Sequence, residues 1–93
     1  MLFMVIERFK RGDPTPIRER FLSQGRMLPE GVVYLASWVD ARAARCFQVM
    51  EAADGASLDP WIKSWADLVD FEVVPVKTSQ EYWARFENRA TGS

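Results

Sequence analysis

The sequence predicts an α+β domain in which helices cover one face of an antiparallel sheet. Two observations lead to this fold class. Four segments are rich in the β-branched and aromatic residues typical of strands, and two of the segments between them repeat their apolar residues with the period of a helix. The chain has 93 residues, which is enough for one domain with a single small core.

The composition indicates more apolar surface than such a core can hide. Apolar residues make up 48% of the chain, and four residues are tryptophan. A domain of this size buries only roughly 60–65% of the surface of its extended chain. We therefore expect part of the apolar surface to contact a partner.

The first strand is expected at residues 2–8, where Phe3 and Val5 favour a strand over a helix. Apolar residues occupy both of its faces, as in a central strand that is covered on two sides. A helix is expected next, with Thr15 as its N-cap and Pro16 in the first helical position.

The next two strands are expected to form a hairpin. Residues 32–39 and 45–51 are β-rich, and residues 40–44 lie between them as a loop. If Val39 pairs with Ala44, one face of the hairpin carries a defined set of side chains: Tyr34, Trp38, Arg45, Phe47, Val49 and Glu51. A shift of the pairing by one residue would turn each of them to the other face.

The strongest helical period lies in the second half of the chain. Its apolar residues recur three and four positions apart and form one stripe: Leu58, Trp61, Ile62, Trp65, Leu68 and Val69. We expect Trp61 and Trp65 to be core residues. The helix begins either after Asp54, which places Pro60 inside it, or at Asp59 with Pro60 in the first position.

A fourth strand is expected at residues 70–76, where Pro75 restricts it to a sheet edge. The resulting order, β-α-β-β-α-β, is the split βαβ or ferredoxin-like pattern. Connection rules give the antiparallel strand order 4-1-3-2 with both main helices on one face. No helix remains for the other face, although the strands are apolar on both sides. We therefore expect a homodimer in which the two sheets face each other.

A last helix is expected after this strand, because residues 78–81 (TSQE) have the form of a capping box. Its narrow apolar side should lie on the domain or reach across to a partner, and consists of Tyr82, Trp83 and Phe86. We place the single domain at residues 1–87 and expect residues 88–93 to be a flexible C-terminal tail.

Several segments resemble one known family. They are residues 1–6 (MLFMVI), 28–32 (LPEGV), Trp38, the strand at 47–51 and, as the most specific block, residues 61–76 (WIKSWADLVDFEVVPV). These segments are similar to the short bacterial proteins called domain of unknown function 3303, over about residues 1–78. The resemblance implies a ferredoxin-like fold of the dimeric α/β-barrel superfamily, in which two sheets close on each other, and brings no established activity. Pro60 departs from the family pattern and puts only the start of the second helix in question.

The residue types exclude several classes of chemistry. The chain has no histidine, the commonest metal ligand, and a single cysteine, Cys46. We therefore expect no metal and no cofactor, and a reducing, cytoplasmic location. The net charge of −1 argues against nucleic-acid or membrane partners. The first apolar run is too short for a signal peptide or a membrane span.

Three carboxylates, Glu7, Glu51 and Glu72, lie in strand-like apolar segments. Each is either paired with a cation or exposed at a strand end, or has a raised pKa that allows it to move protons. Glu72 is the strongest candidate, because apolar residues flank it in the middle of a strand.

Trp38, Tyr34 and Arg45 could line a small-molecule pocket, and with Glu72 they form the candidate ligand-binding set. The alternative is that these aromatic residues pack across the dimer. No catalytic residue can be assigned from the sequence.

The predicted function is that of a cytoplasmic, homodimeric α/β-barrel protein that binds a small molecule or has a regulatory or structural role. The alternative is a cofactor-independent oxygenase or isomerase. Its small organic substrate would occupy a cavity between sheet and helices or within the dimer barrel. The alternative follows from fold analogy with the superfamily.

Overall fold

The computed structural model describes residues 1–40, 42 and 44–92, with residues 87–92 described as backbone only. The bounds of its elements, with two short 3-10 helices labelled η, are β1 Leu2–Phe9, η1 Lys10–Gly12, α1 Thr15–Gln24, β2 Val33–Asp40, β3 Arg45–Glu51, η2 Gly55–Leu58, α2 Asp59–Trp65, β4 Val69–Val76 and α3 Ser79–Gly92. Within the described residues the protein is an α+β domain with one four-stranded antiparallel sheet and three α-helices. The predicted order of these elements is confirmed.

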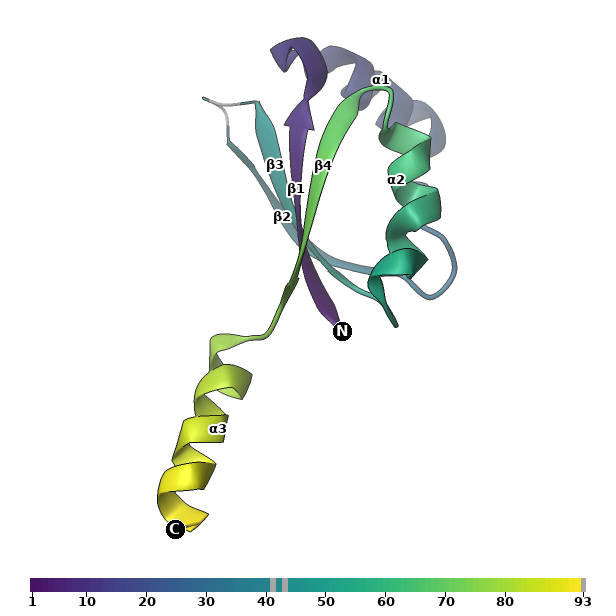
Figure 1. Cartoon of the computed structure of the whole chain (residues 1–93). Helices are drawn as coiled ribbons and strands as arrows, with labels where there is room; N and C mark the ends of the chain where they lie inside the picture. The colour runs from purple at the N-terminus through teal and green to yellow at the C-terminus, as the bar shows by residue number, and fades with distance from the viewer. Residues whose placement is uncertain (41, 43, 93) are drawn as a thin grey trace.

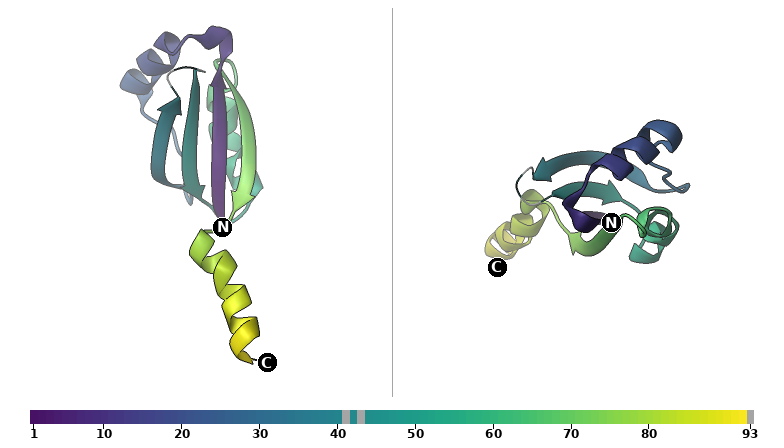
Figure 2. Two further views of the ribbon diagram at one scale, coloured as in Figure 1. Left: turned by 90° about the vertical axis from the view of Figure 1, so that its left-hand side faces the viewer. Right: turned by 90° about the horizontal axis from the view of Figure 1, so that it is seen from above.

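The sheet has β1 in its middle, between β3 and β4 (Figure 2). The strand order is β2-β3-β1-β4, and all three pairings are antiparallel. Read from the other edge this is 4-1-3-2, the order that the sequence predicts. β4 is an edge strand, which tolerates Pro75 because a residue without an N–H can face away from the hydrogen-bond ladder.

α1 and α2 lie on the same face of the sheet (Figure 1). The core forms between this face and the helices, from the residues Phe3, Val5, Val32, Met50, Ala52, Leu58, Trp61 and Trp65. Trp61 and Trp65 are only 1% and 4% exposed, which confirms that both are core residues. The ring of Trp61 meets Phe71 edge to face, with 5.1 Å between the centroids.

Both expected starts of the second helix correspond to features of the structure. The carboxylate of Asp54 accepts a hydrogen bond from the backbone N–H of Ser57 at 2.9 Å and so caps η2. α2 then begins at Asp59, with Pro60 in its first turn, where the missing N–H costs nothing. The helix is shorter than the apolar stripe, because Val69 already belongs to β4.

The start of α1 differs from the expectation by one position. Thr15 is the first helical residue and not the N-cap. Its backbone N–H donates to the carboxylate of Asp13 at 3.0 Å. The aspartate provides the acceptor that the threonine hydroxyl was expected to provide.

The register of the β2–β3 hairpin is not the predicted one. Trp38 pairs with Phe47 instead of Arg45, and a β-bulge lies between Tyr34 and Ala36. The extra residue in β2 reverses the alternation of side chains, so Tyr34 turns toward the helices while Trp38 does not. The prediction that Tyr34 and Trp38 share a face is therefore wrong.

We call the sheet face opposite α1 and α2 the open face. The strand registers place on it a set of apolar residues, none of them buried: Leu2, Met4, Ile6, Ala36, Trp38, Phe47, Val49, Val74 and Val76. Trp38 is 59% exposed. No helix covers this face in Figure 1, as the sequence predicts.

α3 extends away from the rest of the domain (Figures 1 and 2). The hydroxyl of Thr78 accepts a hydrogen bond from the N–H of Glu81 at 3.1 Å, as in a capping box. Tyr82, Trp83 and Phe86 are exposed and pack against one another, with centroid distances of 5.0–5.4 Å. Of the two expected placements, the helix does not lie on its own domain, and the other placement, contact with a partner, stays a prediction.

Two expectations fall partly outside the described residues. The hairpin loop at residues 40–44 includes Ala41 and Ala43, and the tail at residues 88–93 includes Ser93 and side chains that are not described. Among the described helices, none is long and apolar enough to cross a membrane.

Candidate functional site

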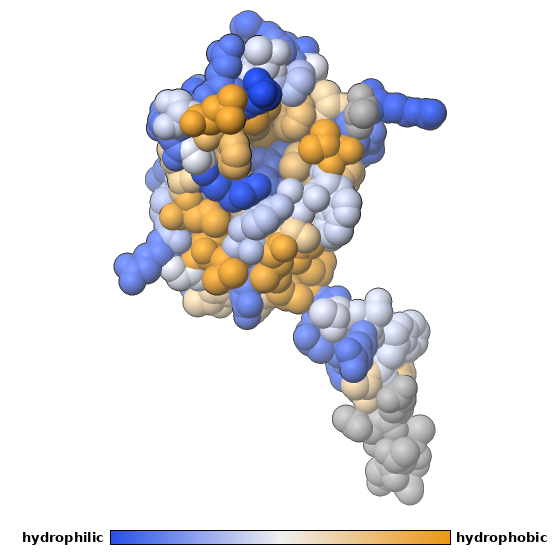
Figure 3. Space-filling view, turned by 180° about the vertical axis from the view of Figure 1, so that it is seen from behind, coloured by the Kyte–Doolittle hydropathy of each residue, from blue (hydrophilic) through white to orange (hydrophobic). Residues whose placement is uncertain are grey.

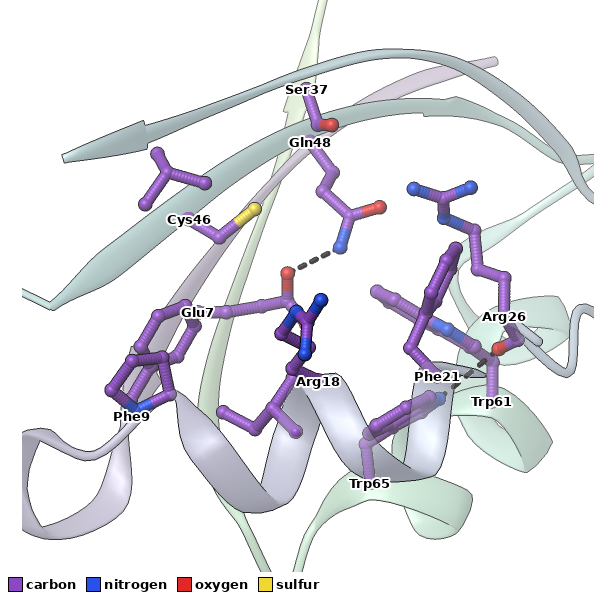
Figure 4. Close-up of a pocket in the computed structure, with 13 residues that line it drawn as sticks. Glu7, Phe9, Arg18, Phe21, Arg26, Ser37, Cys46, Gln48, Trp61 and Trp65 are labelled. Carbon is purple, nitrogen blue, oxygen red and sulfur yellow. Dashed lines mark hydrogen bonds between the residues drawn. The ribbon is translucent and has the colours of Figure 1, made fainter. Parts of the chain in front are cut away.

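A cavity of about 330 Å³ lies between the helix-covered face of the sheet and the helices α1 and α2 (Figure 4). The residues that line it are Glu7, Phe9, Pro14, Ile17, Arg18, Phe21, Arg26, Ser37, Val39, Cys46, Gln48, Trp61 and Trp65. Most of the lining is aromatic or aliphatic. The space-filling view in Figure 3, from the side where α1 is nearest, shows a hollow between hydrophobic patches. Both the volume and the lining are typical of a small-molecule site.

Strand alternation brings a row of polar side chains to the floor of this cavity. Glu7 of β1 pairs with Cys46 of β3, and Gln48 of β3 pairs with Ser37 of β2. Paired residues share a face, and so do residues two apart in a strand. The four side chains therefore lie on the helix-covered face although they come from three strands.

Among the described side chains, Glu7 is the buried carboxylate, at 6% exposure. Burial raises its pKa above the ordinary value of 4.5, while hydrogen bonds from Gln48 and Cys46 and the charge of Arg26 act in the opposite direction. The side-chain amide of Gln48 donates to Glu7 (Figure 4). Burial, followed by the neighbouring Glu7, raises the pKa of the Cys46 thiol to about 12. The thiol is therefore uncharged at neutral pH, and the carboxyl group binds a proton more readily than it would in water.

Two buried polar atoms that belong to residues lining this cavity have no hydrogen-bond partner among the described residues. They are the side-chain oxygen Oε1 of Gln48 and the indole nitrogen Nε1 of Trp61. Both residues are more than nine-tenths buried, at 6% and 1% exposure. The indole of Trp65, in contrast, donates to the backbone oxygen of Arg26 at 3.1 Å. Buried polar groups in proteins are nearly always hydrogen-bonded, so a bound water or ligand would be needed to satisfy these two atoms.

The structure separates the four residues of the predicted ligand-binding set. Trp38, Arg45 and Glu72 lie on the open face, whereas Tyr34 lies on the helix-covered face. The Tyr34 hydroxyl and the Ser37 hydroxyl share a hydrogen bond of 2.6 Å. Whether any of the four binds a ligand stays a prediction, but they do not form one pocket within a single chain.

Glu72 is exposed and paired with a cation, the first of the alternatives expected for the three carboxylates. Its side chain is 51% exposed, and its Oε1 lies 3.4 Å from the guanidinium of Arg8. Glu72 pairs with Ile6 across the sheet and therefore points to the open face, whereas Glu7 pairs with Phe71 and points to the cavity. The parity of Glu7 with the buried Phe3 and Val5 is the sequence signal that could have selected it.

A second signal was available for Gln48, which was not a candidate. It alternates with Met50 along β3, and both are buried at 6% and 0% exposure. A polar residue in phase with a buried apolar one is a candidate for a polar contact inside the domain. In the part of the chain that the structure describes, no group of three acidic, cysteine or histidine side chains could hold a metal ion.

The fold and the cavity define a small α+β domain with a helix-covered pocket whose polar floor is incompletely hydrogen-bonded. The family model described as "Domain of unknown function (DUF3303)" matches residues 1–89, and the chain belongs to this family. This confirms the resemblance that the sequence segments indicate. No curated protein and no solved structure matches the chain.

Proposed function

We propose that this protein is a small-molecule-binding domain whose ligand occupies the cavity between the sheet and the helices α1 and α2. The observation that supports this most strongly is the pair of buried atoms without partners, Gln48 Oε1 and Trp61 Nε1. One is an acceptor and the other a donor, so a ligand with one donor and one acceptor would satisfy both. The apolar walls would supply the remaining binding free energy.

The test is a screen of neutral and charged aromatic fragments by ligand-observed NMR, with a variant that fills the cavity. Val39 lines the cavity, lies at an edge strand and is 67% exposed, so Val39→Trp can place an indole in the cavity mouth without disturbing the core. Leu22→Trp is the control, because Leu22 is equally exposed at 67% but does not line the cavity. The proposal requires fragments that bind the wild type and Leu22→Trp but not Val39→Trp. Equal binding to all three proteins would contradict it.

We further propose that two copies of this ferredoxin-like domain pair through their open faces, as in a dimeric α/β barrel. The support is the set of unburied apolar residues on that face and the absence of any helix over it in the described chain. Charged groups stand at the edges of this face in pairs, Arg8 with Glu72 and Arg45 with Asp40. A pair of sheets closed in this way should bury more than about 1,200 Å². Trp38 would then lie in the dimer interior, with Arg45 and Glu72 at its edges.

A second candidate function is an isomerase that moves a proton without a cofactor. The specific observation is Glu7, a buried carboxylate with a raised pKa that lines the cavity beside an uncharged thiol. A carboxylate of this kind can abstract and return a proton next to a carbonyl group. The keto–enol interconversion of phenylpyruvate, followed by absorbance, is a direct probe. Catalysis that Glu7→Gln abolishes would support this function, and an unchanged rate in that variant would contradict it. No described feature favours the oxygenase alternative.

A cytoplasmic location and the lack of nucleic-acid and membrane partners remain part of this proposal. The solitary Cys46 and the net charge of −1 support them. Fractionation of cells that express the protein at its natural level tests the location.

A further inference from the structure

Two arginines line the cavity and form no ion pair with the carboxylates that the structure describes. Arg18 belongs to α1 and Arg26 follows it, and both contribute to the cavity wall. The ion pairs of the described residues use other cations, namely Arg8, Lys10, Arg20 and Arg45. Arg18 is exposed and Arg26 is half-buried, whereas Gln48 and Trp61 are buried. The cavity therefore has positive charge at its accessible side and uncharged polar atoms at its buried side.

Arg26 is held in place by aromatic rings. Its guanidinium carbon lies 3.7 Å from the ring centroid of Tyr34 and 5.2 Å from that of Phe21. The hydrogen bond between Tyr34 and Ser37 fixes the first of these rings. A guanidinium that stacks on aromatic faces keeps its N–H groups available at its edge, in the geometry that matches a carboxylate. Arg26 is thus preorganised to bind an anion.

The neighbouring Glu7 interacts electrostatically with Arg26 but forms no ion pair with it among the described residues. Burial raises the pKa of Glu7. Glu7 accepts hydrogen bonds from the side chains of Gln48 and Cys46, and it forms no ion pair with either arginine in the described part of the chain.

We propose that the cavity takes a small aromatic carboxylate that carries a hydroxyl group at its other end. In this arrangement Arg26, with Arg18, binds the carboxylate, and the aromatic body lies among Phe9, Phe21 and Trp65. The hydroxyl group, which is both a donor and an acceptor, meets Gln48 Oε1 and Trp61 Nε1. This inference rests on the proposed small-molecule function and specifies the chemical class of the ligand.

The experiment measures the binding of 4-hydroxyphenylacetate by calorimetry and by the NMR signal of the Trp61 indole N–H. Two matched probes accompany it: 4-hydroxyphenylacetamide, which lacks the charge, and phenylacetate, which lacks the hydroxyl group. We expect each to bind at least about tenfold more weakly than the hydroxy acid, because each loses a hydrogen bond with a charged or buried group. The Trp61 signal should shift with the hydroxy acid and much less with phenylacetate.

Three variants test which arginines recognise the charge of the ligand. Arg26→Lys keeps the charge but loses the planar, stacked fork, and Arg18→Gln removes an exposed charge with little risk to folding. Both should weaken the binding of the hydroxy acid and leave that of the amide nearly unchanged. Arg85→Gln, on α3 and outside the cavity, makes the same change in net charge as Arg18→Gln and should alter neither.

The outcomes separate this inference from the proposed function. If the amide binds as tightly as the acid and shifts the Trp61 signal, the cavity binds small molecules but not by their charge, and the inference is wrong. If none of the three probes binds, the inference is wrong, and the fragment screen with Val39→Trp still decides the proposed function. Circular dichroism would reveal whether Arg26→Lys fails to fold. In that case Arg18→Gln and the comparison of the acid with the amide still decide whether the cavity recognises the carboxylate charge.

Discussion

The two faces of the sheet differ in which of their groups are unsatisfied, polar atoms on one face and apolar side chains on the other. The face under α1 and α2 is buried, yet it contains polar atoms without partners, Gln48 Oε1 and Trp61 Nε1. On the open face Arg8 pairs with Glu72 and Arg45 with Asp40, although Arg45 Nε also lacks a hydrogen-bond partner among the described residues, and apolar side chains such as Trp38 lie in solvent. A small polar molecule can satisfy buried polar atoms that lack hydrogen bonds. An exposed apolar sheet face is buried only by another large apolar surface. The two proposals therefore assign a different kind of partner to each face.

The largest predicted difference is in the free energy of unfolding of two tryptophan variants, one from each face of the sheet. Trp61→Ala empties a buried site at 1% exposure and should lower the free energy of unfolding by roughly 3–5 kcal/mol. Trp38→Ala removes a side chain that is 59% exposed and should cost less than about 1 kcal/mol in the monomer. Urea unfolding at a low protein concentration measures both. Similar values for the two variants would mean that the assignment of the faces is wrong.

Association should depend on the open face alone. Trp38→Glu places a charge among the apolar residues of that face and should convert the expected dimer to a monomer in sedimentation velocity at micromolar concentration. Leu22→Glu is the control, because Leu22 is 67% exposed on the outer side of the domain. A wild type that sediments as a monomer, or a Trp38→Glu variant that remains a dimer, would contradict the proposed pairing.

Two carboxylates extend the comparison to pH dependence. Because the pKa of Glu7 is raised in the folded protein, the folded state holds more protons than the unfolded state above pH 4.5. The contribution of Glu7 to stability is therefore fully present below this pH and is lost as the pH rises through the folded pKa. Glu7→Gln, which keeps the shape and the contact with Gln48, should raise the free energy of unfolding at pH 8 relative to the wild type but not at pH 4.

The smallest effect is expected at Glu72. Its side chain is 51% exposed and its ion pair with Arg8 is solvated. Glu72→Gln should change the free energy of unfolding by no more than about 0.5 kcal/mol, with little dependence on pH. Chemical denaturation of the two Glu→Gln variants at the same two pH values provides the measurement. A larger change at Glu72 than at Glu7 would restore Glu72 as the carboxylate of interest.

The fold could be predicted because its signals depend on residues that are close together in the sequence. These signals are the periodicity of apolar residues and the rules for connections between elements. The stripe through Trp61 and Trp65, the proline at the edge of β4 and the order of the elements were sufficient for the topology. The hairpin register was not predictable in the same way. The bulge between Tyr34 and Ala36 has no glycine or proline to mark it, so the alternation in β2 gave no sign of the reversal.

The candidate site was harder to predict because both faces of the sheet are apolar. In β1, Phe3 and Ile6 have similar hydropathy but lie on opposite faces, so hydrophobicity does not tell which face the helices cover. Glu72 was chosen for its apolar sequence neighbours, although neighbours in a strand point to the other side. The choice between Glu7 and Glu72 requires the pairing of β1 with β4, a contact between residues that are distant in the sequence.

The NMR signals of the tryptophan indole N–H groups test the difference between the two faces most directly. One series of spectra follows dilution of the protein, and a second follows the addition of 4-hydroxyphenylacetate, with signals assigned by Trp→Phe variants. We predict that the Trp38 signal shifts on dilution and not with the probe, because Trp38 lies on the open face. The Trp61 signal, from the buried donor without a partner, should shift with the probe and not on dilution. A Trp38 signal that follows the probe, or a Trp61 signal that does not, would contradict the division of roles between the faces.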